Sequence, residues 1–516
     1  MLSRTLIRRK VFCNPTCSEI FLPKGTSCKS GKDIYACDMA PNTTLKIENT
    51  FSQLFTEDQR VKDILWGAMR FRERNYFHNV RYKMKMWDGY IDFFKRESGR
   101  FLTGLLPEVR LALKQMGVEY AVIDKRNAVK FTQEKVDEQW LMKYLQPGMK
   151  PVELRDYQVD YINQSFRNLR GIVYAPTSAG KTNILIGTLL ALPPDTPTLV
   201  LANRKSLVDQ NYEEIRMWGI KDVGRFYGDH KEVRSITCAT VQSAHLLKAH
   251  FPKVKCLFVD EIHEMMSKKP RAVYNACRNA SVRIGMSATP FKFGEKDKVQ
   301  KYEVKGYIGP VFVASNTETG RLSTKDLQAR EILASADCVF YPIHEPKLPY
   351  HIYLDAVTDG IAHNMVLHEM TRRLVEKLDG RVLIIVERIS HGDLLHDLIP
   401  GSLWVRGQDT IEIRKDIIKK LKENTNKTVA IATSGIFNTG INVFVHSLIN
   451  CAGGQAEHQI VQRFGRGLRV ADDKKHLKYY DWIFTNNDYL EKHSWKRVDI
   501  LQKEGHKVTI MEEFDL

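Results

Sequence analysis

The segment Ala175-Pro176-Thr177-Ser178-Ala179-Gly180-Lys181-Thr182 follows an apolar run and leads into a helical pattern over residues 183–192. A loop between a strand and a helix presents backbone N–H groups at the helix N-terminus, where phosphate binds. Lys181 supplies a cation for the β- and γ-phosphates, and Thr182 supplies a hydroxyl for Mg²⁺. The segment therefore predicts a P-loop formed by residues 175–182, although Ala175 replaces the first glycine of the usual pattern.

Two adjacent acids end another apolar run, in Leu257-Phe258-Val259-Asp260-Glu261-Ile262-His263. Carboxyl ends of parallel strands meet at one edge of a sheet, so we expect these acids to lie beside the P-loop. There Asp260 can bind Mg²⁺, and Glu261 can orient or deprotonate an attacking water. An acidic turn at a strand end would explain the two acids alone. It would not explain why His263, and then Ser287-Ala288-Thr289 at the end of a further run, complete the pattern.

Short β-branched runs alternate with helical spans in two parts of the chain. The first set covers residues 171–175, 198–202, 235–239, 256–259 and 282–286, and the second covers residues 382–386, 403–405, 429–432 and 447–451. Such alternation predicts parallel sheets. We therefore expect an α/β protein with two parallel-sheet domains in tandem after a small α+β domain. The expected domains are residues 39–150, 151–320 and 321–516, with a hinge in the Gly-, Ser-, Thr- and Asn-rich stretch 309–321.

Composition restricts the classes of partner. The 516 residues contain 78 Lys plus Arg and 61 Asp plus Glu, a formal net charge of +17. A balance this basic favours binding to polyanions, with nucleic acid as the first candidate. No apolar run approaches the roughly 18 residues that a membrane-spanning helix requires, so the sequence argues against a transmembrane protein.

Cysteine usage indicates a reducing compartment, because the nine cysteines are an odd number and five of them fall in predicted core segments. The other four, Cys13, Cys17, Cys28 and Cys37, have spacings that fit a zinc site only loosely, so incidental thiols are favoured. We expect residues 1–38 to be a poorly ordered basic leader, with a transit peptide as the alternative.

Eight segments in order resemble the motifs of the superfamily 2 helicases: residues 154–158, 175–182, 199–210, 237–242, 260–263, 287–289, 429–443 and 462–469. The resemblance implies two RecA-like domains that use ATP and Mg²⁺. It implies that Gln158 reads the adenine, that Asp260 is a metal ligand and that Glu261 is the catalytic base. In the 433–442 segment Gly440 is the matching nucleotide-site residue, whereas Ser434 and Asn442 stand where many relatives carry acids.

The same resemblance assigns roles to the remaining motif residues. His263 would pair with Gln462, while Ser287 and Thr289 would couple the nucleotide state to the grip on a strand. Arg466 and Arg469 would act as arginine fingers, because a guanidinium stabilises charge on a transferring phosphoryl group. The implied contacts to a nucleic-acid backbone are Arg204, Lys205, Thr240, Gln242, Arg388 and Thr433.

The stretch 70–100 carries nine Lys or Arg, four acids and eight aromatic residues. Basic side chains neutralise phosphates and aromatic rings stack on bases, so we assign Arg81, Lys83, Lys85 and Trp87 to nucleic-acid binding. Aromatic residues at strand spacing are usually core, so at least half of the eight should pack inward. Alternation around Asp88-Gly89 predicts a hairpin, with a positive φ at Gly89.

Several segments look like the phage UvsW-type recombination helicases: Trp87-Asp88-Gly89, Gly104-Leu105-Leu106, residues 386–392, and His493, Ser494 and Arg497. In that group the small N-terminal domain helps to engage branched duplex DNA. The resemblance therefore implies an ATP-dependent DNA helicase that unwinds forks and branch-migrates Holliday junctions or R-loops in phage recombination and replication. It also favours a monomer in a host bacterial cytoplasm.

Three alternatives remain open at this point. An RNA-directed DExH helicase or an XPB-like repair translocase would share the motor motifs, but the Trp87-Asp88-Gly89 block argues against it. A DNA-binding scaffold without ATPase activity is disfavoured by the intact Lys181, Glu261, Arg466 and Arg469. The motor portion of a restriction complex would require a separate nuclease, because the chain carries no nuclease motif.

Overall fold

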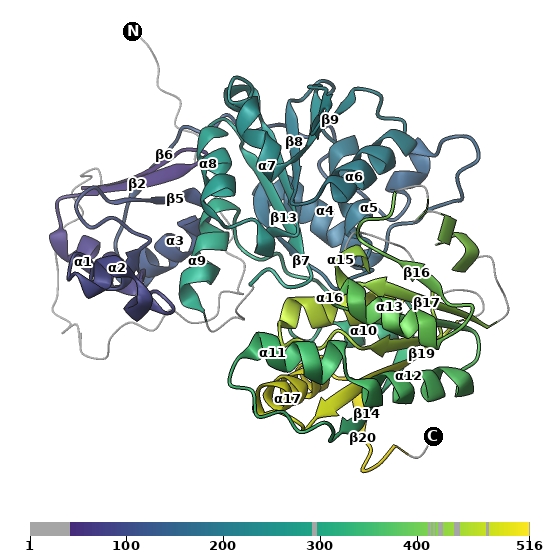
Figure 1. Ribbon diagram of the computed structural model, residues 1–516. Coiled ribbons are helices and arrows are strands. Elements are labelled where there is room, and N and C mark those ends of the chain that lie inside the picture. Colours follow the sequence, from purple (N-terminus) through teal and green to yellow (C-terminus); the bar gives the residue numbers. More distant parts are fainter. Residues whose placement is uncertain are drawn as a thin grey trace, which may run out of the picture. The chain divides into compact units, whose positions relative to one another are not determined.

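The computed structural model describes residues 42–291, 297–410, 427–437, 444–470 and 474–514, together with residues 413, 416, 417 and 419–421. The chain divides into two compact units (Figure 1): Met1–Ile47 with Phe51–Asp124, and Glu48–Thr50 with Lys125–Leu516. The predicted leader, its four cysteines, Gly440 and Asn442 lie outside the described residues. The proposed domain borders near residues 150 and 320 stay predictions.

The N-terminal unit is a small α+β domain. Its sheet has the order β5-β2-β1-β6, with β1 antiparallel to β2 and parallel to β6. The strands are β1 (Thr43–Ile47), β2 (Phe51–Thr56), β5 (Arg100–Leu102) and β6 (Ala121–Asp124), and a separate pair is formed by β3 (Arg70–Arg72) and β4 (Tyr90–Asp92). The helices are α1 (Gln59–Ala68), η1 (Tyr76–His78), α2 (Val80–Lys83), η2 (Thr103–Leu105) and α3 (Leu106–Gln115). Leu45, Leu54, Leu65, Phe94 and Val109 form its buried core.

The hairpin predicted at Asp88-Gly89 is wrong. Residues 80–83 form helix α2 instead of a strand, because the Asn79 side chain accepts a hydrogen bond from Arg81 N and caps the helix. Strand β4 pairs with β3, so the connection between the paired strands contains η1 and α2. The positive φ at Gly89 is confirmed at 84°, and a Cβ there would lie 2.9 Å from the Tyr76 ring.

The first parallel sheet has the order β10-β9-β11-β8-β12-β13-β7 and is parallel except at the β10 edge. Its strands are β7 (Arg170–Tyr174), β8 (Thr198–Ala202), β9 (Val223–Tyr227), β10 (His230–Lys231), β11 (Ile236–Thr240), β12 (Cys256–Asp260) and β13 (Val282–Ser287). The accompanying helices are η3 (Trp140–Tyr144), α4 (Asp156–Asn168), α5 (Lys181–Leu190), α6 (Lys205–Met217), α7 (Val241–Ala244), η4 (His245–Leu247), η5 (Phe251–Lys253), η6 (Ile262–Glu264), α8 (Lys268–Ala276) and α9 (Lys298–Tyr307).

Alternating strand residues of this sheet enter two different cores. Leu257 and Val259 pack in a cluster with Tyr274 of α8 and Val304 of α9. Phe258 packs in the other cluster, which also contains residues of α4, α5 and α6. Because helices cover both faces, these strands read as continuous apolar runs instead of alternating patterns.

The second parallel sheet has the order β16-β17-β15-β18-β19-β14-β20, and every neighbouring pair is parallel. Its strands are β14 (Ser335–Ile343), β15 (Arg381–Val386), β16 (Leu403–Val405), β17 (Thr428–Thr433), β18 (Ser447–Asn450), β19 (His476–Phe484) and β20 (Lys507–Ile510). Its helices are α10 (Thr324–Ala329), α11 (Tyr353–Val357), η7 (Thr358–Ala362), α12 (Met365–Lys377), α13 (Ile389–Leu398), α15 (Ser434–Phe437), α16 (Glu457–Gly467) and α17 (Asp488–Lys503).

The predicted fold class is confirmed: two parallel-sheet α/β domains follow a small α+β domain. All nine strands expected in the two parallel sheets are present, with bounds shifted by one residue at most. The analysis missed β9, β14, β19 and β20, and the short β10. Strand β14 includes Asp337 and Pro342, and β19 is rich in aromatic and charged residues, so neither forms a β-branched run. Over the described part of the chain, no helix is long and apolar enough to cross a bilayer.

Candidate active site and nucleic-acid contacts

Three neighbouring strands carry the predicted catalytic motifs to one edge of the first sheet. The P-loop follows β7, Ser287 ends β13, and Asp260 ends β12. The register pairs Asp260 with Met286 and Ser287 with Tyr174, so the three strand ends lie at one level. Motifs separated by more than 100 residues are therefore side by side at the carboxyl edge, where α/β sheets bind ligands.

The P-loop turns through two left-handed residues, Ser178 with φ 67° and Gly180 with φ 78°. A Cβ at position 180 would lie 2.3 Å from Gln158 Nε2, so only glycine fits this close approach. Lys181 begins α5, and its Nζ donates to the carbonyl oxygens of Ala175 and Pro176 at 3.2 Å each. Partial burial lowers the pKa of Lys181, and Glu261 and Asp260 oppose that shift. The ammonium therefore lies across the loop, facing the two acids.

Gln158 supports the P-loop directly. Its Nε2 donates to Ala179 O at 2.9 Å, and its Oε1 accepts from Arg155 N at 3.0 Å. The Tyr157 hydroxyl donates to the same Ala179 oxygen at 2.9 Å. Gln158 is fully buried, and both ends of its amide are engaged by the chain itself. Its predicted contact to adenine stays a prediction.

The two acids differ in their electrostatic surroundings. Glu261 has a left-handed backbone with φ 48°, and its N–H donates to Asp260 Oδ1 at 3.0 Å. Burial raises the pKa of Asp260 to about 6, and the neighbouring Glu261 charge adds to the shift. Burial also opposes ionisation of Glu261, but the hydrogen bond from His263 and the charge of Lys181 lower its pKa to about 2. Glu261 is therefore the carboxylate that stays ionised.

A serine hydroxyl connects the coupling residues to Glu261. Ser287 Oγ donates to Glu261 Oε2 at 3.2 Å, lies 2.8 Å from His263 Nδ1 and accepts from Thr289 N at 3.0 Å. Because this hydroxyl donates to Glu261, the His263 proton belongs on Nδ1. The predicted coupling residues His263, Ser287 and Thr289 are thus brought together beside the acids. The pairing of His263 with Gln462, which is itself buried, stays a prediction.

Helix α16 of the second sheet domain contacts the P-loop. Arg469 Nε donates to Ser178 Oγ at 2.8 Å, and a Cβ at Gly465 would lie 2.9 Å from Thr177. Burial lowers the pKa of Arg466 to about 10, while the charges of Glu261 and Asp260 oppose the shift. The two predicted arginine fingers therefore belong to the same site as the acids and the phosphate loop.

Sequence analysis missed the role of Arg463, the third arginine of that helix segment. Its side chain is 4% exposed and donates to Gly453 O at 3.2 Å and to Glu387 Oε2 at 3.0 Å. The same carboxylate oxygen accepts from Ser434 Oγ at 2.6 Å. Glu387 follows β15 and Ser434 follows β17, which are neighbours in the sheet. This Arg463–Glu387–Ser434 cluster therefore connects α16 to the residues beside Arg388 and Thr433.

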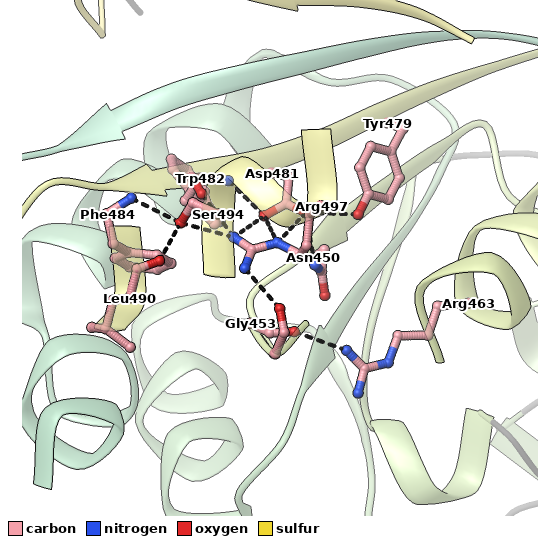
Figure 2. A network of polar contacts seen from close by, with 11 residues as sticks. Asn450, Gly453, Arg463, Tyr479, Asp481, Trp482, Phe484, Leu490, Ser494 and Arg497 are labelled. Carbon is pink, nitrogen blue, oxygen red and sulfur yellow. Dashed lines mark hydrogen bonds and ion pairs between the residues drawn. The ribbon is translucent and has the colours of Figure 1, made fainter. Parts of the chain in front are cut away.

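A second buried arginine holds the loop before α16 (Figure 2). Arg497 of α17 contacts both carboxylate oxygens of Asp481 at distances of 2.9–3.2 Å and donates to Gly454 O at 3.1 Å. Figure 2 shows Arg463 contacting Gly453 from the other side of that loop. Ser494 and Arg497 matched the family, but no role for them followed from the sequence. In the structure Arg497 supports the loop that leads into α16.

The six predicted backbone contacts follow strand ends, but their side chains differ in accessibility. Lys205 and Gln242 are exposed. Arg204 Nη1 donates to Gly435 O at 3.0 Å, and Arg388 Nη1 donates to Thr358 Oγ1 at 2.6 Å. The two threonines are less accessible: Thr433 is 8% exposed, and Thr240 is 4% exposed and caps α7.

The basic residues predicted in the N-terminal unit, Arg81, Lys83 and Lys85, are exposed. Trp87 is different, because it is only partly exposed and its Nε1 donates to Tyr90 O at 2.7 Å. Its predicted contact to bases stays a prediction. Of the eight aromatic residues, Phe93 and Phe94 are buried, five are partly buried and Phe77 is exposed. Two of the partly buried rings contact arginines: Tyr90 lies 4.5 Å from Arg70, and Tyr76 lies 4.7 Å from Arg72.

Comparisons with known proteins find similar chains. Residues 151–292 match the family described as "Type III restriction enzyme, res subunit". The chain is 25% identical over 438 residues to the ATP-dependent DNA helicase uvsW of Enterobacteria phage T4, covering 80% of this chain and 85% of the relative. It is 23% identical over 364 residues to the DNA 3'-5' translocase XPB2 of Sulfurisphaera tokodaii, covering 62% and 80%.

A solved structure shows the same fold. The structure of S. cerevisiae Dbp5 bound to RNA and ADP BeF3 aligns with 75% of this chain and 96% of its own, with a TM-score of 0.52 at 15% identity.

Proposed function

We propose that the chain is an ATP-dependent DNA helicase of superfamily 2 that unwinds forks and branch-migrates Holliday junctions or R-loops. The observation that carries this proposal is the convergence of the P-loop, the two acids, Arg466 of α16 and Arg469 just after it at one sheet edge. Arg469 reaches the P-loop at Ser178, so nucleotide chemistry involves both sheet domains. The rate of ATP hydrolysis would therefore depend on how the two sheet domains are arranged.

Each group at the site has a task in phosphoryl transfer. Backbone N–H groups of the P-loop and Lys181 bind the phosphates of ATP, which places the γ-phosphoryl group before Glu261. Glu261 is ionised, so it accepts a hydrogen bond from the attacking water and orients it. Arg466 and Arg469 stabilise the charge that develops on the transferring group. Hydrolysis breaks the bond between the γ-phosphoryl group and ADP, and release of the phosphate product then removes the anion that these arginines bind.

The residues also fit Mg²⁺. Thr182 and Asp260 offer a hydroxyl and a carboxylate, the hard oxygen donors that this ion prefers. Among the described residues no cluster of three His, Cys, Asp or Glu could hold a metal without help, so phosphate and water oxygens would complete the coordination. When bound, Mg²⁺ neutralises charge on the β- and γ-phosphates.

DNA as the track is supported by the named activities of the phage and archaeal relatives. Arg204, Lys205, Gln242 and Arg388 would bind the phosphate backbone, so these contacts would not depend on the base sequence. Thr240 and Thr433 stay proposed contacts through their backbone positions. A monomer in a host bacterial cytoplasm also stays a proposal.

The test is ATP hydrolysis with no nucleic acid, single-stranded DNA, duplex DNA, a four-way junction or RNA, at matched nucleotide concentration. We expect stimulation by DNA, strongest with branched forms. Stimulation by RNA alone would show that the enzyme acts on RNA and not on DNA, and it would leave the assignment as an ATPase unchanged. Absence of hydrolysis under every condition would favour a binding scaffold.

A further inference from the structure

A short segment of the N-terminal unit exposes four large apolar side chains. Phe77 is 51% exposed, Val80 60%, Met84 64% and Met86 66%. Exposed apolar side chains that gather in one place mark interaction sites more often than scattered ones do. We call this set the 77–86 surface.

The segment has a defined conformation that keeps these side chains outward. Met84 N donates to Val80 O at 2.9 Å, and Met86 N donates to Arg81 O at 2.8 Å. Lys85 has a left-handed backbone with φ 57°, which closes the turn after α2. Val80 and Met84 are one helical turn apart and share a face.

Aromatic packing supports the segment from the inner side. The Tyr76 and Tyr82 rings meet edge to face at 4.6 Å, and Arg72 lies 4.7 Å from the Tyr76 ring. Tyr76 also fills the space beside Gly89, where a Cβ would collide with its ring. The tyrosines and Trp87 therefore form the support, and the phenylalanine and methionines form the outer surface.

The charged side chains within residues 74–87 have one sign, and the flanking Asp88 is paired with Arg70. Residues 74–87 contain Arg74, Arg81, Lys83 and Lys85 and no Asp or Glu. Arg81, Lys83 and Lys85 are exposed beside the apolar groups. Cations at this spacing complement a phosphate backbone. Phe and Met are among the side chains that proteins insert between base steps to unstack them.

We propose that Phe77, Met84 and Met86 form an apolar wedge that inserts at the branch point of DNA, while Arg81, Lys83 and Lys85 bind the flanking phosphates. The proposal rests on the DNA helicase function and adds the element that unstacks bases. Insertion breaks stacking at one step, so the wedge lowers the work that opening the next base pair requires.

The test compares two triple variants of the full chain. The wedge variant carries Phe77→Ala, Met84→Ala and Met86→Ala. The matched control carries Phe55→Ala, Val122→Ala and Ile123→Ala, which removes three other exposed apolar side chains of the same unit, 45–47% exposed. Circular dichroism and thermal unfolding confirm that both variants fold.

The first readout is the fluorescence of an adenine analogue at the branch point of a fork, without ATP. Wild type and control should raise the fluorescence by unstacking the analogue, and the wedge variant should not. The second readout is strand separation with ATP, which should fall roughly tenfold in the wedge variant, as expected when one base-stacking contact is lost. ATPase stimulated by single-stranded DNA should stay within about twofold.

The outcomes separate this inference from the proposed function. Equal fluorescence changes in wild type and wedge variant would overturn the wedge, even with full ATPase activity. If wild type hydrolysed no ATP, the fluorescence arm would still test insertion. Binding of wild type, but not the wedge variant, to phosphatidylserine vesicles without any fluorescence change on forks would assign the surface to membranes instead.

Discussion

The P-loop region and residues 74–87 both carry cations for phosphate, but they hold them in opposite ways. Lys181 is partly buried, is bonded to loop carbonyls and faces two acids. Arg81, Lys83 and Lys85 are exposed, and no acid occurs within their segment. Catalysis needs charges fixed and partly desolvated before the substrate arrives, whereas backbone binding needs charges that can exchange with counterions. Loss of one residue should therefore be severe in the first region and graded in the second.

The largest effect is expected at Glu261 and Lys181. Glu261→Gln removes the carboxylate that orients the water and should lower kcat about 10,000-fold while ATP still binds. Lys181→Ala should remove both hydrolysis and tight ATP binding. The measurement is phosphate release with an ATP-binding assay, and Lys248→Ala, an exposed lysine of the same domain, is the control. DNA-stimulated turnover near wild type in either variant would contradict the site assignment.

A smaller but still large effect is expected at Arg466, which tests whether the second sheet domain completes the site. Arg466→Gln should lower kcat about 1,000-fold and leave the dissociation constant of ATP nearly unchanged. The charges of Glu261 and Asp260 raise the pKa of Arg466 against the effect of burial, so Arg466 lies beside the two acids. A guanidinium there stabilises the charge that develops on the transferring phosphoryl group. Arg372→Gln, on the surface of α12, serves as the control. A loss of ATP affinity with unchanged kcat would show that Arg466 only binds substrate.

The exposed cations should respond in a graded way. Neutralising Arg81, Lys83 and Lys85 together should reduce the slope of log affinity against log salt by about 2.7, since each phosphate contact contributes about 0.9. Basal ATPase should not change. The measurement is junction binding by fluorescence anisotropy from low to moderate salt. An unchanged slope would show that these residues do not bind DNA phosphates. A loss of basal ATPase as large as the loss of DNA affinity would show that the two regions do not act separately.

Substitutions in the Arg463–Glu387–Ser434 cluster should have an intermediate effect, because none of the three residues is among the proposed contacts to ATP or DNA. Glu387→Gln keeps the shape but weakens a charge-assisted hydrogen bond to a buried guanidinium. DNA-stimulated turnover should fall about tenfold, with basal turnover within about twofold. Glu376→Gln on α12 is the control. Parallel loss of basal and stimulated rates would mean that Glu387 supports folding and not coupling.

Sequence predicted the fold and the ATP site more completely than the surfaces. Buried parallel strands are recognisable as apolar runs, and the residue types at their ends indicate phosphate and metal binding. Lys181, Asp260 and Ser287 were therefore predicted to lie together. The partial burial of Trp87 was not predictable, because composition shows that aromatics and cations are interleaved but not which side chains face solvent. The Arg463 and Arg497 contacts were missed because each joins residues that are near only after folding.

The smallest effect is a pH dependence that separates the two acids. The pKa of Asp260 is raised to about 6, so its carboxylate protonates as pH falls through 6, whereas Glu261, whose pKa is lowered, stays ionised. Protonated Asp260 cannot bind Mg²⁺ well, so apparent Mg²⁺ affinity should be halved near pH 6 and fall about tenfold per further pH unit. High Mg²⁺ should shift the midpoint downward by linkage, and Asp260→Asn should abolish the pH dependence while weakening Mg²⁺ binding at every pH. Titration of ATPase against Mg²⁺ between pH 5 and 8 checks this, and a midpoint that Asp260→Asn leaves in place would assign the titration to another group.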